Sequence, residues 1–190
     1  MKSSELRNVF LLVVFCLITF FANRAALPTD IMESRNIITA REMVSDGNWL
    51  VPTMNGELRL EKPPFPTWVA GGIEELFPGS LSAQRFAAGV MACIWVLYLY
   101  LFVRRASRRD DLALVTVIVF TTCYNMILMG RSATWDIYCH AFMMGAIYYL
   151  TLGFTESRHC WRNFLLSGFF MGFSFLSKGP VSFYALLLPY

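Results

Sequence analysis

Charged side chains of both signs occur in a few short stretches of an otherwise apolar chain, and their types match phosphate and proton chemistry. Arg and Lys can stabilise the charge of a phosphate group. A carboxylate can take a proton from an attacking hydroxyl, or orient it. Four separate parts of the sequence supply such residues: Asp30, Glu33, Arg35, Glu61, Lys62, Arg131, Asp136 and Lys178.

Asp136 and His140 are four residues apart, which places them on one face of a helix. Asp136 stands where a helix is expected to begin, so it is either a functional acid or a cap for free backbone N–H groups. His140 is a further candidate for the site, although a lone histidine on an apolar helix is more often an interior residue with its hydrogen bonds satisfied.

Lys178 is followed at once by Gly179 and Pro180, a glycine and a residue that often starts helices. This arrangement either aims a cation and backbone N–H groups at an anion, or lets the lysine reach the membrane interface. Glu61 and Lys62 alone read as an ordinary solvated pair, and Asp30, Glu33 and Arg35 are also consistent with a polar helix start. The remaining charges of this part of the chain read as solvated: Asp46, Glu57, Arg59, Glu74 and Glu75.

The elements that position these residues are predicted to be membrane helices. Of the 190 residues, 56% are hydrophobic and only 15% are charged, which is fewer charges than soluble domains carry. A membrane-spanning helix needs about 20 mostly apolar residues. The fold class is therefore an all-α, polytopic transmembrane bundle, with spans expected at about residues 9–27, 81–103, 112–129, 135–154, 164–176 and 181–190.

Basic residues cluster before the first span, between the second and third, and between the fourth and fifth. By the positive-inside rule these sites are cytoplasmic. The loop at residues 28–80 and the turns near Arg131 and Lys178 then share the outer face. A cleavable signal peptide is the alternative for the first segment, but the later spans favour an uncleaved helix.

The outer loop is expected to hold two interfacial helices. Apolar and charged residues alternate from Met32 to Val44 as in an amphipathic helix that ends at Asp46-Gly47. Asn55-Gly56 indicates a tight turn. An aromatic stretch from about Pro66 to Phe77 follows as the second helix.

The composition argues against a nucleic-acid-binding site and against disulfide or metal sites built from cysteines. The net charge of +3 is spread over loops, so nucleic acid is not an expected partner. Four of the five cysteines lie in apolar runs without CxxC spacing and read as small core residues.

Several motifs in order resemble the first outer loop of class C glycosyltransferases, nearest to the bacterial aminoarabinose transferases of lipid A and the protein O-mannosyltransferase-like group. The motifs are Ala40–Met43, Gly47–Pro52, Asn55-Gly56 and Glu61–Pro64. Arg131–Asp136 resembles the start of the family's fourth helix, and Ser177–Pro180 resembles a further recurring turn. Together these motifs cover most of residues 28–180.

The resemblance implies inverting transfer of a sugar from a polyprenyl-phosphate donor to a lipid, protein or glycan acceptor, at the periplasmic face of the bacterial inner membrane. Arg35 and Lys62 match phosphate-binding cations, and Arg131 and Lys178 are added as phosphate-binding candidates. Asp136 matches an important acid.

Two positions bear on the acid and on a metal. Glu61 matches a carboxylate that in some relatives helps to bind a divalent metal ion. The family usually has an Asp-Glu pair ahead of Ala40, and here Met32 stands where that Asp belongs. Asp30 or Glu33 is then the acid.

Two rival functions remain open at this stage. A transporter or lipid flippase would use the same charges along a substrate path, and a membrane scaffold would use the outer loop to bind a partner. Relatives in the family are far longer, so the chain is expected to be the N-terminal portion of the enzyme, with little activity by itself.

Overall fold

The computed structural model describes residues 3–190, and their side chains from Arg7 onward. The helices are α1 (Ser3–Cys16), α2 (Ile31–Ser45), α3 (Phe65–Leu76), α4 (Leu81–Ser107), α5 (Asp110–Thr122), α6 (Tyr124–Gly130), α7 (Trp135–Thr155) and α8 (Cys160–Lys178). Two π-helical turns, η1 (Leu17–Phe21) and η2 (Phe183–Leu187), and a hairpin of β1 (Thr53–Met54) and β2 (Glu57–Leu58) complete the described chain.

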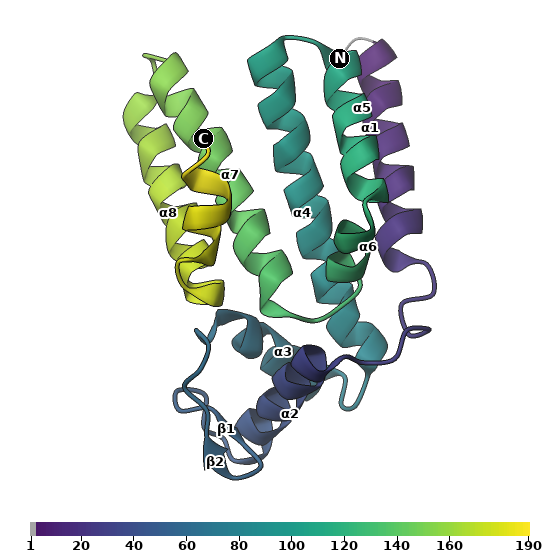
Figure 1. Cartoon of the computed structure of the whole chain (residues 1–190), viewed down its shortest axis with the longest axis vertical. Coiled ribbons are helices and arrows are strands. Elements are labelled where there is room, and N and C mark those ends of the chain that lie inside the picture. The colour runs from purple at the N-terminus through teal and green to yellow at the C-terminus, as the bar shows by residue number, and fades with distance from the viewer. Residues whose placement is uncertain (1–2) are drawn as a thin grey trace.

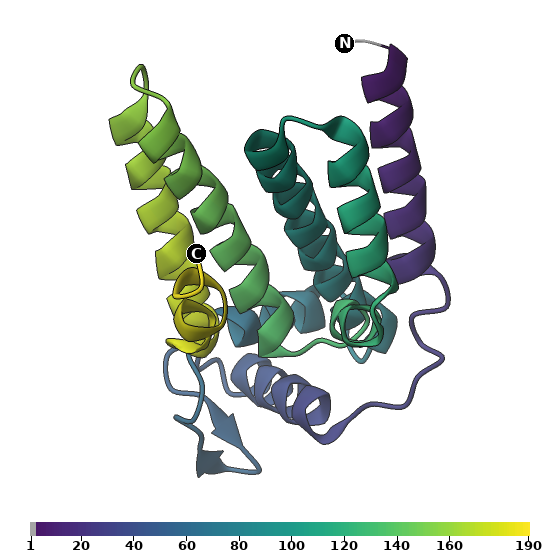
Figure 2. The ribbon, with the colours of Figure 1, turned by 45° about the horizontal axis from the view of Figure 1, so that its top comes forward.

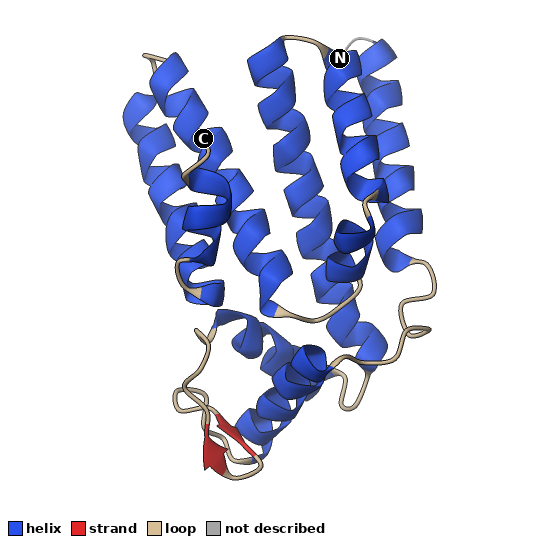
Figure 3. Cartoon of the chain, viewed as in Figure 1, coloured by secondary structure: helices blue, strands red, loops and turns tan. Residues whose placement is uncertain are grey.

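The long helices form a bundle, and α2, α3 and the hairpin form a separate layer at one end of it (Figures 1 and 3). Within the bundle, α7 packs against α8 on one side and α4 on the other, while α5 packs against α4 and α1. Figure 2 shows α7 and α8 leaning away from the group of α1, α4 and α5. The predicted all-α architecture is confirmed.

Two of the described helices, α4 and α7, are long and apolar enough to cross a membrane. The consecutive helices α5 and α6 meet the same criteria only when counted together as a bent pair. Arg7–Phe21 is apolar but shorter, and α8 does not meet the criteria. The protein is therefore a membrane protein, and the full set of six spans stays a prediction.

The third predicted span is not one straight helix. The chain bends by 74° between α5 and α6, because Cys123 takes an extended conformation with ψ of 132°. Neither Pro nor Gly occurs at this point, so the sequence carried no signal for the break. The last predicted span, 181–190, is helical only from residue 181 to residue 187, and Phe183–Leu187 of it is the π-helical turn η2.

The outer layer matches the sequence interpretation closely. α2 begins one residue before the predicted helix and ends at Ser45, and α3 is displaced from its predicted bounds by one residue at each end. Asn55 and Gly56 have φ of 57° and 78°, as the tight turn of a hairpin requires. The carboxylate of Glu42, on α2, accepts hydrogen bonds from Thr53 Oγ1 at 2.8 Å and from the backbone N–H groups of Asn55 and Gly56. Glu42 thus fixes the hairpin to α2.

Close packing at glycines ties the helices together. A Cβ on Gly130 would overlap the Phe20 ring, and one on Gly145 would lie 2.8 Å from the Phe170 ring. Phe20 is fully buried, with 0% of its surface exposed. These glycines therefore let an aromatic ring sit directly against a helix backbone.

The end of the bundle away from α2 carries the basic clusters. Arg104 pairs with Asp110 at 2.7 Å, and Arg105 pairs with Glu156 at 3.4 Å, which links the α4–α5 turn to the end of α7. The start of α1 and the α7–α8 turn lie at the same end (Figure 1). This common end agrees with the predicted topology, and its assignment to the cytoplasm stays a prediction.

Candidate functional site

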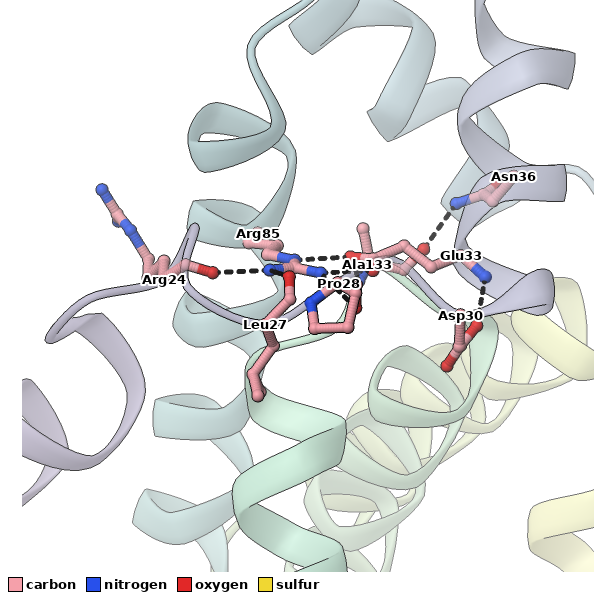
Figure 4. Close-up of polar contacts among 8 residues, drawn as sticks. All are labelled: Arg24, Leu27, Pro28, Asp30, Glu33, Asn36, Arg85 and Ala133. Carbon is pink, nitrogen blue, oxygen red and sulfur yellow. Dashed lines mark hydrogen bonds and ion pairs between the residues drawn. The ribbon is translucent and has the colours of Figure 1, made fainter.

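Glu33 lies at the centre of the contact between the outer layer and the bundle. Its carboxylate forms a two-pronged ion pair with Arg85 of α4, with distances of 2.8 Å to Nε and 2.7 Å to Nη2. The same carboxylate accepts a hydrogen bond from the backbone N–H of Ala133, just before α7, at 2.9 Å (Figure 4). Both side chains of the pair are 1% exposed.

Arg85 uses every N–H of its guanidinium. Besides Glu33, it donates to the backbone carbonyls of Arg24, Leu27 and Pro28, at 2.6, 2.8 and 3.4 Å (Figure 4). Because all five donors are satisfied, burial of this charge is compensated. The pair therefore fixes the 24–28 segment, α2, α4 and the start of α7 to one another. Sequence analysis missed Arg85, whose only signal is an arginine in the first turns of an apolar helix.

Asp30 is the N-cap of α2. One carboxylate oxygen accepts a hydrogen bond from the backbone N–H of Glu33 at 2.7 Å (Figure 4). The residue is exposed, and within residues 3–190 its other oxygen has no hydrogen-bond partner. Asp30 thus keeps a free, accessible carboxylate oxygen, whereas Glu33 does not.

Asp136 and Lys178 form an ion pair across α7 and α8. Asp136 is in the first turn of α7 and Lys178 is the last residue of α8, and their side chains are 32% and 20% exposed. The sequence-predicted acid and cation are therefore brought together. The positive charge of Lys178 is largely neutralised by this partner.

His140 lies one turn beyond Asp136. Its Nδ1 is 3.0 Å from Ser182 Oγ, and its ring is 5.2 Å from that of Trp95, centre to centre. Ser182 Oγ is also 3.0 Å from Cys139 Sγ, to which it donates. Either atom of the His140–Ser182 contact can be the donor, according to the tautomer of the imidazole.

Arg131 has a structural partner. Its guanidinium donates to the carbonyls of Thr19 at 2.6 Å and Ile18 at 3.4 Å, at the π-helical end of the first helix. The guanidinium of Arg131, a predicted phosphate-binding group, therefore binds the backbone of η1.

Three cations gather on the flank of the outer layer that faces α7. Lys62 is half-buried, and it lines a small cavity together with Arg59 and Trp135. Arg35, from α2, repels Arg59 electrostatically, and so belongs to the same cluster. Since Trp135 directly precedes Asp136 in the chain, Lys62 lies beside the start of α7. The cations of the outer loop and the acid of α7 therefore share one region.

Two residues read as solvated from the sequence are in fact buried. Arg59 is 6% exposed and Glu74 is 8% exposed. Glu74 pairs with Arg41 at 3.1 Å and accepts from the backbone N–H of Gly79 at 2.9 Å. It joins α2 to the turn after α3.

Glu61 is a poor metal ligand by itself. Its side chain is 63% exposed, and its nearest ionic partner is Arg59 Nε at 3.9 Å. Within residues 3–190 no group of three or more His, Cys, Asp or Glu side chains is placed to hold a metal ion. The described residues therefore give Glu61 no companion ligands, and metal binding at Glu61 stays a prediction.

Comparison with known proteins identifies related sequences. Residues 61–190 match the family model described as dolichyl-phosphate-mannose-protein mannosyltransferase. The undecaprenyl phosphate-alpha-4-amino-4-deoxy-L-arabinose arabinosyl transferase of Shewanella sediminis is 32% identical over 83% of this chain and 28% of its own length. A second such transferase, from Proteus mirabilis, is 25% identical over 99% of this chain and 34% of its own length.

Solved structures share the fold. The crystal structure of ArnT from Cupriavidus metallidurans in the apo state superposes with a TM-score of 0.83, at 22% identity, over 98% of this chain and 36% of that one. The same protein bound to undecaprenyl phosphate gives a TM-score of 0.79, at 19% identity, over 100% of this chain and 35% of that one. The chain thus spans about a third of the length of the proteins that it matches.

Proposed function

Because the chain belongs to the dolichyl-phosphate-mannose-protein mannosyltransferase family, we propose that it forms part of a glycosyltransferase using a polyprenyl-phosphate-linked sugar. The acceptor is a lipid, protein or glycan at the periplasmic face of the bacterial inner membrane, which the protein crosses several times. The relatives are named as transferases, and nothing in them favours the transporter or flippase alternative. One solved relative is named as bound to undecaprenyl phosphate, which supports that class of donor.

One observation carries the proposal. Lys62 has no hydrogen-bond or ionic partner within residues 3–190, and it lines the same cavity as Trp135. Trp135 is followed in the chain by the acid Asp136. An unpaired cation against the residue that directly precedes an acid suits a reaction in which a phosphate leaves and an acceptor oxygen arrives.

In the proposed step, the acceptor oxygen forms a bond to the anomeric carbon while the bond from that carbon to the phosphate oxygen breaks. The phosphate leaves with the electron pair of the broken bond, and its charge is stabilised by Lys62 and Arg35. Lys178, already paired with Asp136, acts by holding that acid in place.

We assign the proton-accepting or orienting role to Asp30. Its free oxygen is accessible, whereas the two oxygens of Glu33 are occupied by Arg85 and Ala133 in a site closed to solvent. Proton transfer by a positioned side chain is typically worth about 10²–10⁴-fold in rate. Asp30 therefore replaces the family's acid, whose position is occupied by Met32 in this chain.

The test is sugar transfer from radiolabelled donor in membranes containing the full-length protein. Lys62→Met and Asp136→Asn are each expected to lower the rate by about 10²-fold or more. Glu57→Gln, a change at an exposed residue of the same outer layer, is the matched control and keeps the normal rate. Normal transfer in both site variants, with equal protein levels, would remove the site proposed here.

A further inference from the structure

Two buried hydrogen-bond donors beside Lys62 have no acceptor. Arg59 Nη2 and the indole Nε1 of Trp135 are both shielded from solvent, and neither has a hydrogen-bond partner. Arg59 is 6% exposed and Trp135 is 2% exposed. Buried donors in native proteins are almost always paired, so two unpaired donors in one place indicate a missing acceptor.

The charge of Arg59 is also poorly compensated. Nη1 donates to the carbonyl of Arg35 and to Thr39 Oγ1, both at 2.7 Å, but these partners are neutral. The nearest carboxylate, Glu61, is exposed and 3.9 Å from Nε. Burial lowers the pKa of the Arg59 guanidinium; attraction to Glu61 opposes that change, and repulsion from Arg35 adds to it. A buried cation of this kind is expected to have an anionic partner.

A small cavity connects these groups. Arg59 Cζ is 5.2 Å from the centre of the Trp135 ring, so the guanidinium lies over the indole. Seven residues line the cavity: Thr39, Pro52, Arg59, Lys62, Pro64, Thr67 and Trp135. Its volume of about 10 Å³ is close to the least that one water-sized atom needs. The hydroxyls of Thr39 and Thr67 donate to Arg35 O and Asn36 Oδ1, and neither hydroxyl accepts from Arg59 Nη2 or Trp135 Nε1.

We propose that this cavity receives one non-bridging oxygen of the donor phosphate, bound by Arg59 Nη2 and Trp135 Nε1, with Lys62 contacting the rest of the phosphate. The inference rests on the proposed function and adds two phosphate-binding residues to it. The cavity admits a single oxygen and its unpaired groups are all donors, so the ligand is an acceptor with negative charge. Because Trp135 opens α7, this contact fixes the phosphate beside Asp136.

The test is a binding titration of the full-length protein with undecaprenyl phosphate in phosphatidylcholine nanodiscs. Trp135→Phe removes the indole N–H and keeps an aromatic ring. Loss of a hydrogen bond to a charged group is expected to weaken binding by roughly tenfold or more. Trp68→Phe is the matched control, because Trp68 Nε1 already donates to the carbonyl of Trp49 at 2.7 Å. It should leave the affinity unchanged.

Arg59→Lys provides a second variant, which keeps the charge but cannot present Nη2. It is expected to weaken binding as Trp135→Phe does, and it carries the test if Trp135→Phe does not fold. Unchanged affinity in the folded variants would show that the cavity holds only water, and would overturn the inference while leaving the proposed function intact.

A parallel titration with inorganic phosphate separates the two proposals. If the protein binds inorganic phosphate, with the expected losses in Trp135→Phe and Arg59→Lys, but never binds undecaprenyl phosphate, the anion site stands and the proposed donor is wrong. If it binds neither, both proposals fail.

Discussion

Replacing Arg85 by Met should destabilise the protein strongly, because Arg85 is the counter-ion of a carboxylate that water cannot reach. The substitution leaves Glu33 with only the N–H of Ala133, and it removes the donor to three backbone carbonyls. Breaking a buried ion pair from one side costs about 3–5 kcal/mol. We therefore expect the free energy of unfolding to fall by at least about 3 kcal/mol.

The assay is reversible unfolding of the purified protein in mixed micelles, titrated with a denaturing detergent and followed by far-ultraviolet circular dichroism. Glu156→Gln is the matched control, because its pair with Arg105 is about 40% exposed on both sides and is worth only about 0–1 kcal/mol. The double variant Glu33→Leu with Arg85→Met should recover part of the loss, because it leaves no unpaired charge buried.

A loss below about 1 kcal/mol in Arg85→Met would refute this reasoning, since a buried pair would then behave like an exposed one. The same series also separates stability from chemistry at Glu33. If Glu33→Gln abolishes sugar transfer without changing the free energy of unfolding, Glu33 rather than Asp30 acts in the reaction.

Three further predictions concern single positions. Asp30→Ser keeps an N-cap oxygen but removes the carboxylate, so transfer should fall by about 10²-fold or more while the unfolding midpoint stays within a few degrees; a normal rate would contradict the role given to Asp30. The hairpin contact lowers the pKa of Glu42 from its ordinary value of 4.5, chiefly through the Thr53 hydroxyl, so the stability it adds is present above that value and lost as pH falls below it. Amide exchange in the hairpin, corrected for intrinsic rates, should therefore accelerate on acidification in the wild type but not in Glu42→Gln, and equal profiles would refute the coupling. Gly130→Ala should cost about 1–3 kcal/mol of unfolding free energy because its Cβ meets Phe20, whereas Gly168→Ala, with nothing within 4 Å, should not destabilise, and equal effects would show that the Phe20 contact is not tight.

The outer layer could be predicted from the sequence because local signals define it. The cap at Asp30 and the turn at Asn55-Gly56 act over a few residues, and both appear in the structure. The amphipathic period of α2 is likewise readable over a short window. Helix bounds in this layer therefore agree within one residue.

The residues that the sequence did not reveal depend on distant partners. Glu33 meets Arg85 across 52 positions and Ala133 across 100 positions, so no local pattern marks the pair. Arg59 looked like a solvated loop residue, but it is buried, and its guanidinium lies over the ring of Trp135 in α7. The topology thus predicted that the candidate residues lie at one end of the bundle, as they do in the structure (Figure 1), while their hydrogen bonds and ion pairs could be seen only in the tertiary structure.

The bond from Arg131 to the carbonyl of Thr19 has a consequence for biosynthesis. The two residues are 112 positions apart, so at about 5–20 residues per second the ribosome needs roughly 6–22 s to deliver the arginine after the carbonyl has emerged. During that interval the Thr19 carbonyl lacks the hydrogen bond that Arg131 donates in the folded structure. The contact between η1 and the segment before α7 can therefore form only after the contacts that α4 and α5 make with the first helix become possible.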